Sequence, residues 1–146
     1  MAGSEGEEMT NLGGKSMVYV YVASRSDGMH KIGVTGDVEK RCATLSRMLP
    51  KHRPIKVLRS LDIGHDAPLI EKVAHHGMVS QGYTMHSLEW FEASAETCIA
   101  AVDSAVQLIS EIGRYGWMKR RVAARKEWLN EATRRTWQHR SICRKA

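Results

Sequence analysis

A strict alternation of valine and tyrosine over residues 18–22 is the feature that most constrains the fold of this chain. Because neighbouring side chains of a strand point to opposite faces, the alternation places the valines on one face and the rings of Tyr19 and Tyr21 on the other. A polar turn containing Gly28 follows, and residues 31–35 form a second, mainly apolar run. Glycine tolerates the positive φ that tight turns need, so the segment predicts a β-hairpin.

A helix is expected directly after the hairpin. Asp37 has the position of its N-cap, and apolar residues continue at helical spacing as far as Met48. Arg41 lies one turn into this helix, so its side chain can point back over the tyrosine face of the hairpin.

The rest of the core shows the same mixture of periods. We expect a strand over residues 54–61, a helix over 66–80, a short strand at 89–92 and a helix capped by Ser94 that continues to Ile109. The fold class that these patterns predict is α/β, with a small, mostly antiparallel three-stranded sheet flanked by helices and a basic C-terminal helix.

Charge divides the chain into three parts. Residues 1–16 are glycine-rich and acidic and predict a disordered leader, whereas residues 17–110 carry ten basic and ten acidic groups. Residues 111–146 carry eleven basic and three acidic groups, so the basic character of the chain is a C-terminal property. We therefore predict a neutral core and a basic helical extension, which suits a polyanion such as DNA. A solvated helix face that only maintains solubility is the alternative.

The C-terminal helix combines aromatic and basic side chains. At about 100° per residue, six side chains of this helix fall within a sector of roughly 160°: Trp117, Met118, Val122, Ala124, Trp128 and Leu129. We expect Trp117 and Trp128 to pack on the core, although tryptophan with arginine between could also stack on bases. The residues expected to contact DNA are Lys119, Arg120, Arg121 and Arg125.

Composition excludes several classes of protein. No apolar run approaches the ~20 residues that span a membrane, and the N-terminus lacks the basic and then apolar pattern of a secretory signal. The three cysteines are scattered, without paired metal-ligand spacing. A reduced, cytoplasmic setting is therefore expected.

Five elements in a fixed order resemble the core of the GIY-YIG endonuclease superfamily. They are Tyr19, the Lys-Ile-Gly triplet at 31–33, Arg41, Glu71 and the Glu-Trp-Phe triplet at 89–91. The second triplet is similar to that of a phage-associated subgroup, which reads KIG. No single triplet is specific, but the ordered set covers most of the chain.

The resemblance implies a phosphodiester hydrolase. It implies that Tyr19 is the general base or orients the attacking water, that Arg41 binds the scissile phosphate, and that Glu71 is the sole protein ligand of Mg²⁺ or Mn²⁺. Lys31 stands where many relatives carry a second tyrosine, and its ammonium would favour the phenolate of Tyr19 by opposite-charge attraction. Tyr21 is placed equally well on the strand, so the choice of tyrosine stays open.

Two departures from the family pattern concern the general base and a supporting contact. Leu45 occupies the position, one turn after the arginine, where many active relatives carry histidine or tyrosine, and a downstream asparagine has no match. Glu71 and His75 share one helix face, but no further ligand pair has suitable spacing, so zinc is disfavoured. A donor role for His75 beside Glu71 stays open, and Glu89 is interpreted as a group at a strand edge.

The sequence thus predicts a metal-dependent DNA endonuclease that uses Tyr19, Lys31, Arg41 and Glu71. The alternative is a non-catalytic nucleic-acid-binding module on the same fold. A weaker alternative makes the basic helix a membrane-surface or protein-docking element. One active site cuts one strand, so a double-strand cut would need a homodimer or two successive events.

Overall fold

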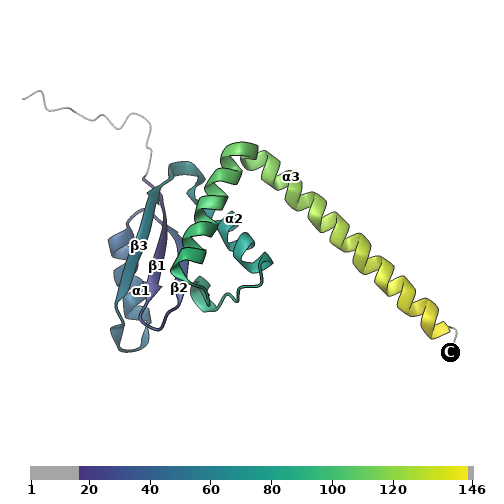
Figure 1. Cartoon of the computed structure of the whole chain (residues 1–146), viewed down its shortest axis with the longest axis horizontal. Coiled ribbons are helices and arrows are strands. Elements are labelled where there is room, and N and C mark those ends of the chain that lie inside the picture. Colours follow the sequence, from purple (N-terminus) through teal and green to yellow (C-terminus); the bar gives the residue numbers. More distant parts are fainter. Residues whose placement is uncertain (1–16, 145–146) are drawn as a thin grey trace, which may run out of the picture. The chain divides into compact units, whose positions relative to one another are not determined.

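The computed structural model describes residues 17–144, and the leader predicted for residues 1–16 lies outside them. A four-stranded antiparallel sheet with the strand order β3-β1-β2-β4 is flanked by helices (Figure 1). Its strands are β1 (Tyr19–Arg25), β2 (His30–Thr35), β3 (Ile55–Asp62) and β4 (Trp90–Phe91). The helices are α1 (Val38–Met48), α2 (Ala67–Ser80) and α3 (Ala95–Arg144), with single turns η1 (Pro50–His52), η2 (Gly64–Asp66) and η3 (Ser87–Glu89).

These elements confirm the predicted α/β class and the hairpin. The short segment expected at 89–92 is a strand of two residues, β4, and it enlarges the predicted three-stranded sheet to four strands. It pairs with the start of β2, where Lys31 lies opposite Trp90. This pairing brings residues from the end of the compact core next to the hairpin.

The hairpin lies at the centre of the core. β1 pairs on one side with β2 and on the other with β3, and Val20, Tyr21 and Val22 are each 1% exposed. Both faces of β1 are therefore covered. On the tyrosine face, Tyr21 and Ala23 pack with Leu45 of α1.

The predicted side-chain caps are present at the start of α1 and of α3. The Asp37 carboxylate accepts a hydrogen bond from the Lys40 backbone N–H at 3.1 Å and begins α1. The Ser94 hydroxyl accepts one from the Thr97 N–H, also at 3.1 Å, at the start of α3. Both side chains satisfy backbone donors that the first turn of a helix leaves without partners.

The chain forms two units, a compact one up to Val106 and a second one from Gln107. Backbone dihedrals leave the helical region at Gly113, within α3 (φ 69°, ψ 175°). The boundary that charge predicts at residue 110 stays a prediction.

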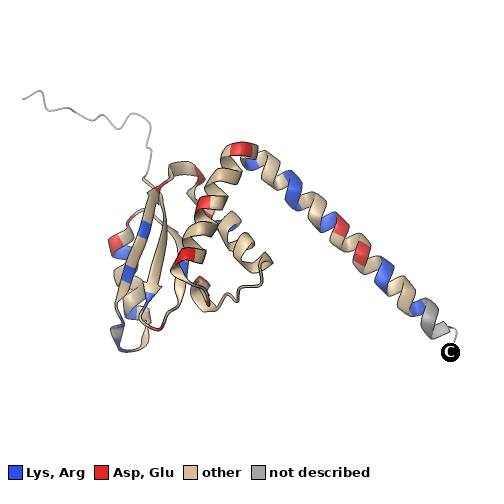
Figure 2. Cartoon of the chain, viewed as in Figure 1, with Lys and Arg blue, Asp and Glu red and all other residues tan. Residues whose placement is uncertain are grey.

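The second unit presents its charges to solvent. Lysine and arginine recur along it (Figure 2), and nearly every described side chain from Met118 to Arg140 is exposed. Trp117 is buried, at 8% exposure. Trp128 is 67% exposed, and its packing on the core stays a prediction. Across residues 17–144, no helix is both long and apolar enough to span a bilayer.

Candidate functional site

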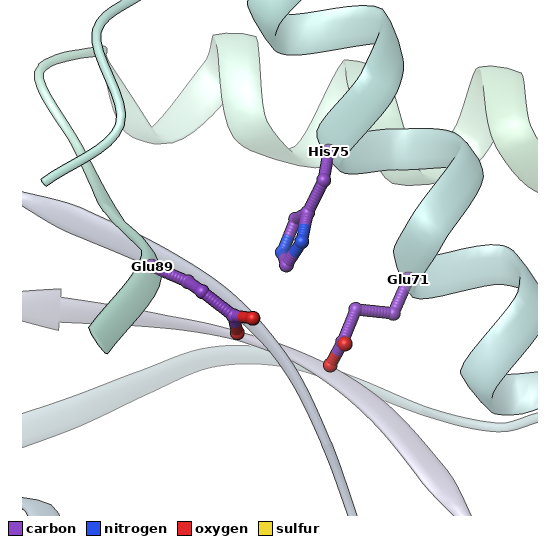
Figure 3. A group of neighbouring side chains, drawn as sticks. All are labelled: Glu71, His75 and Glu89. Atoms are coloured by element: carbon purple, nitrogen blue, oxygen red, sulfur yellow. The ribbon is translucent and has the colours of Figure 1, made fainter. Parts of the chain in front are cut away.

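Three side chains from two parts of the chain converge beside the hairpin. Glu71 and His75 project from one face of α2, four residues apart, and Glu89 projects toward them from η3, the turn before β4 (Figure 3). One ligand atom from each, a carboxylate oxygen or an imidazole nitrogen, lies within 4.8 Å of the others. The interpretation of Glu89 as a group at a strand edge therefore misses its proximity to Glu71 and His75.

Backbone groups of β2 hold the two side chains of α2. The His75 Nε2 lies 2.8 Å from the carbonyl oxygen of Ile32, and a carbonyl can only accept, so Nε2 carries the proton. The Val34 N–H donates a hydrogen bond to the Glu71 carboxylate. Both contacts fix α2 side chains against the same strand, which limits their freedom before any ligand binds.

Lys31 supplies a buried positive charge at the edge of this cluster. It is 3% exposed; its Nζ donates to the carbonyl oxygen of Leu88 and lies 3.3 Å from Oε2 of Glu89. Burial lowers the pKa of Lys31, and the negative charge of Glu89 opposes that effect. The pair ties β2 to the turn that carries Glu89.

The turn itself has an uncommon backbone. Leu88 and Glu89 have φ values of 59° and 64°, a left-handed conformation that side chains other than glycine adopt rarely. This conformation accompanies the contact of the Leu88 carbonyl with Lys31 and the approach of the Glu89 carboxylate to α2. Strained backbone of this kind is found at functional sites more often than elsewhere.

Burial dominates the electrostatics of Glu71. It raises the pKa of this carboxyl, and the negative charge of Glu89 acts in the same direction. His75, Lys31 and the Val34 N–H act in the opposite direction. A carboxylate in such surroundings gains from a cation, because a cation restores the solvation that burial removes.

Tyr21 brings a hydroxyl close to the same cluster. Burial raises the pKa of Tyr21, and the neighbouring Arg41 guanidinium opposes this effect. The hydroxyl is buried, and no group among residues 17–144 makes a hydrogen bond of normal geometry with it. Its ring lies over Gly33, where an added Cβ would come within 2.5 Å of the Tyr21 hydroxyl oxygen. Glycine at this position is therefore a packing requirement of the tyrosine.

The sequence-predicted residues fall into three groups. Lys31, Arg41 and Glu71 come together, and their charges influence one another. Tyr19 begins β1, half-buried, and its hydroxyl donates to the sulfur of Met17 at 3.2 Å. The four basic residues of the second unit, Lys119, Arg120, Arg121 and Arg125, are exposed.

Two of these basic residues have aromatic neighbours within the same unit. The Lys119 ammonium lies 4.9 Å from the centre of the Tyr115 ring, and the Arg121 guanidinium lies 5.2 Å from that of Trp117. Contacts of this kind are attractive and orient the cation over the ring face. They leave the two cations exposed to solvent.

The donor set fits a divalent cation. Two carboxylates and one imidazole are common ligands of such ions, and all three side chains are partly rather than fully buried, which leaves access for solvent and substrate. Bonds of ~2.0–2.2 Å place opposite ligand atoms roughly 4 Å apart. A spread of 4.8 Å therefore needs only a small closing movement of flexible glutamate side chains.

Comparison with known proteins identifies the family. The model of the T5orf172 domain matches residues 16–110. Neither the curated proteins nor the solved structures contain a significant match to this chain. Because the family model covers more than half of the sequence, the chain belongs to the T5orf172 domain family, which is related to the GIY-YIG nuclease-like fold.

Proposed function

We propose that this protein is a metal-dependent DNA endonuclease. The observation that carries the proposal is the convergence of Glu71, His75 and Glu89 beside a buried lysine and a half-buried arginine, in a domain related to a nuclease fold. Hydrolysis of a phosphodiester needs a cation for the phosphoryl charge, an activated water and a proton donor for the leaving oxygen. This cluster offers groups suited to each of these tasks.

Glu71 is the proposed protein ligand of Mg²⁺ or Mn²⁺. When bound, such an ion supplies Lewis-acid stabilisation of the phosphoryl oxygens and lowers the pKa of a coordinated water. Arg41 is the proposed ligand of the scissile phosphate, because its guanidinium offers several donors in a planar fork. Lys31 adds a further positive charge to the site, and its contact with Glu89 positions that carboxylate.

The geometry favours Tyr21 over Tyr19 as the functional tyrosine. The buried Tyr21 hydroxyl lies beside Arg41 and close enough to Glu71 for their charges to influence its pKa. Tyr19, which the family register favours, instead donates to Met17. We assign to Tyr21 the hydrogen bond to the attacking water or to a phosphate oxygen.

DNA binding is assigned to the second unit. Lys119, Arg120, Arg121 and Arg125 are exposed on it, where they can contact phosphates without loss of a buried partner. Because each neutralised phosphate releases counterions, binding through this helix should weaken steeply with salt. The same surface supports the alternative, a nucleic-acid-binding module without catalysis.

Incubation of the full chain with supercoiled plasmid in Mg²⁺, Mn²⁺ or EDTA tests the proposal. Glu71→Gln preserves the volume of the side chain and removes its charge, so cleavage should fall by ~10²-fold or more while a gel shift persists. Glu96→Gln, at an exposed glutamate in the first turn of α3, is the matched control and should cleave normally. A salt-sensitive gel shift without metal-dependent cleavage by the wild type would favour the binding module.

A further inference from the structure

The arrangement around Glu71 goes beyond a site with one protein ligand. We propose that His75 and Glu89 bind the same ion as Glu71, and that the His75 nitrogen makes this centre selective for first-row transition ions, represented by Mn²⁺, over Mg²⁺. The inference rests on the proposed function in placing the catalytic cation beside Glu71. It differs from the proposed function in giving the ion three protein ligands instead of one and in naming the class of ion that the site prefers.

The orientation of His75 supports its role as a ligand. Its Nε2–H donates to the Ile32 carbonyl oxygen, so a neutral ring keeps its lone pair on Nδ1. Histidines that bind metals commonly donate their other ring N–H to a carbonyl or a carboxylate, which fixes the tautomer and the ring plane. The ring also packs against Phe91, with ring centres 5.5 Å apart, so that β4 limits its rotation.

Glu89 is held by charge and by backbone conformation. Its Oε2 lies 3.3 Å from Nζ of the buried Lys31, and the left-handed backbone of Leu88 and Glu89 projects the side chain toward α2. A carboxylate has two oxygens and about four lone-pair sites, so it can accept from an ammonium and still coordinate an ion. Lys31 therefore positions Glu89 without occupying all of its capacity.

The donor set decides the class of ion. Mg²⁺ prefers oxygen ligands, keeps several waters and is usually held by one or two carboxylates. Imidazole nitrogen suits transition ions, whereas carboxylates suit both classes, so a site with two carboxylates and one imidazole favours the transition ions. Without His75, only two carboxylates remain, and the difference between the Mn²⁺ and Mg²⁺ affinities should be much smaller.

Binding of Mn²⁺ to the full chain without DNA tests the inference. Loss of the electron paramagnetic resonance signal of free Mn²⁺ gives its affinity, and competition gives that of Mg²⁺. We expect Mn²⁺ to bind at least tenfold more tightly than Mg²⁺. His75→Ala should lower the Mn²⁺ affinity by ~10- to 100-fold and leave that of Mg²⁺ nearly unchanged. His76→Ala, at the exposed neighbour on the same helix, should change neither affinity.

A spectroscopic measurement on the wild type avoids dependence on the folding of a variant. Electron spin-echo modulation should show coupling of bound Mn²⁺ to an imidazole nitrogen, and His76→Ala should retain it. Absence of this coupling, no Mn²⁺ binding, or an Mg²⁺ affinity equal to that of Mn²⁺ would each overturn the inference. Mn²⁺ bound with nitrogen coupling but without plasmid cleavage would reject the nuclease and keep the site. Metal-dependent cleavage without nitrogen coupling would support the nuclease and overturn the inference that His75 is a ligand.

Discussion

The two units of this protein use charged side chains in opposite ways. In the compact unit, Lys31, Arg41, Glu71 and Glu89 come from four different elements and are partly or wholly buried. In the second unit, nearly all charged side chains are exposed, and the ion pairs described there join residues three or four apart, such as Glu131 with Arg134 and Arg135. Pairs of that kind contribute only about 0.3–0.5 kcal/mol each.

This contrast indicates how each unit should respond to substitution. A buried charged or polar group depends on specific neighbours, so the loss of one group leaves another without compensation. Exposed charges on one helix act on a polyanion nearly independently, so their effects should add. We therefore expect single changes to have large effects in the compact unit, and only combined changes to do so in the second unit.

The largest expected difference is between the two tyrosines of β1. Tyr21→Phe removes the buried hydroxyl beside Arg41 and should lower the rate of plasmid cleavage by ~10²-fold or more, the usual contribution of one positioned hydrogen-bonding group. Tyr19→Phe removes a hydroxyl that donates to Met17 and should change the rate by less than about threefold. Single-turnover cleavage by both variants measures the ratio, and equal rates would remove the distinction between the rings.

A combined change in the second unit tests additivity. Replacing Lys119, Arg120, Arg121 and Arg125 by alanine should weaken DNA binding and make the plot of log affinity against log salt shallower by about 3 to 4, since each phosphate contact contributes roughly 0.9. Mn²⁺ affinity should be unchanged, because none of these residues belongs to the cluster beside Glu71.

A control variant removes the same number of charges from the compact unit. Its substitutions are at exposed cations outside the cluster, Lys40, Arg47, Arg53 and Lys56. If only net charge governs DNA binding, both combined variants will show the same reduction in the salt slope. If the helix is the binding surface, the control will retain most of the wild-type slope.

Much of the fold could be predicted because its determinants are local. Alternation over residues 18–22, the caps Asp37 and Ser94 and the break after Ser80 are each written within a few neighbouring residues. The exposure of Trp128 could not be predicted in this way, since whether a helix face is covered depends on tertiary packing. Helical periodicity shows which residues share a face but does not show what, if anything, covers it.

The site was partly predictable for the same reason. Glu71 and His75 are four apart on one helix, so their proximity follows from the sequence. Glu89 approaches them through the pairing of β4 with β2 and through the left-handed backbone of its turn. Neither feature can be predicted from a pattern of neighbouring residues. Tyr21 differs from Tyr19 in its partner across the hairpin, which is Gly33. The absence of a side chain at Gly33 leaves space for the Tyr21 ring, and this depends on the pairing register of β1 and β2.

Two glycine-to-alanine substitutions compare the stability effect of an added methyl group at a packed position and at an open one. Gly33→Ala places a methyl group against the buried Tyr21 ring and should lower the free energy of unfolding by about 1–3 kcal/mol. Gly77 lies in α2, and apart from its own chain neighbours and the nearby backbone of that helix no heavy atom lies within 4 Å of the new Cβ, so Gly77→Ala should raise that free energy by about 0.5–1 kcal/mol. Urea unfolding measures both, and a stable Gly33→Ala would mean that the ring can move aside.

The smallest expected effect is at Asp27. It tests whether the contribution of a charge to stability depends on its exposure or on the unit in which it lies. Asp27 lies in the compact unit, and its carboxylate accepts hydrogen bonds from Arg25, one of them at 2.7 Å. Arg25 lowers the pKa of Asp27 from 3.8 to about 2, so the stabilisation is present above pH 3.8 and is lost as the pH falls through about 2. Because a third of the carboxylate side chain is exposed (34%), solvent screening should keep the contribution below about 1 kcal/mol. Asp27→Asn should therefore destabilise slightly at pH 7, and its difference from the wild type in urea unfolding should shrink between pH 4 and pH 2. A loss of several kcal/mol would instead show that this exposed pair depends on its neighbours as the buried cluster does.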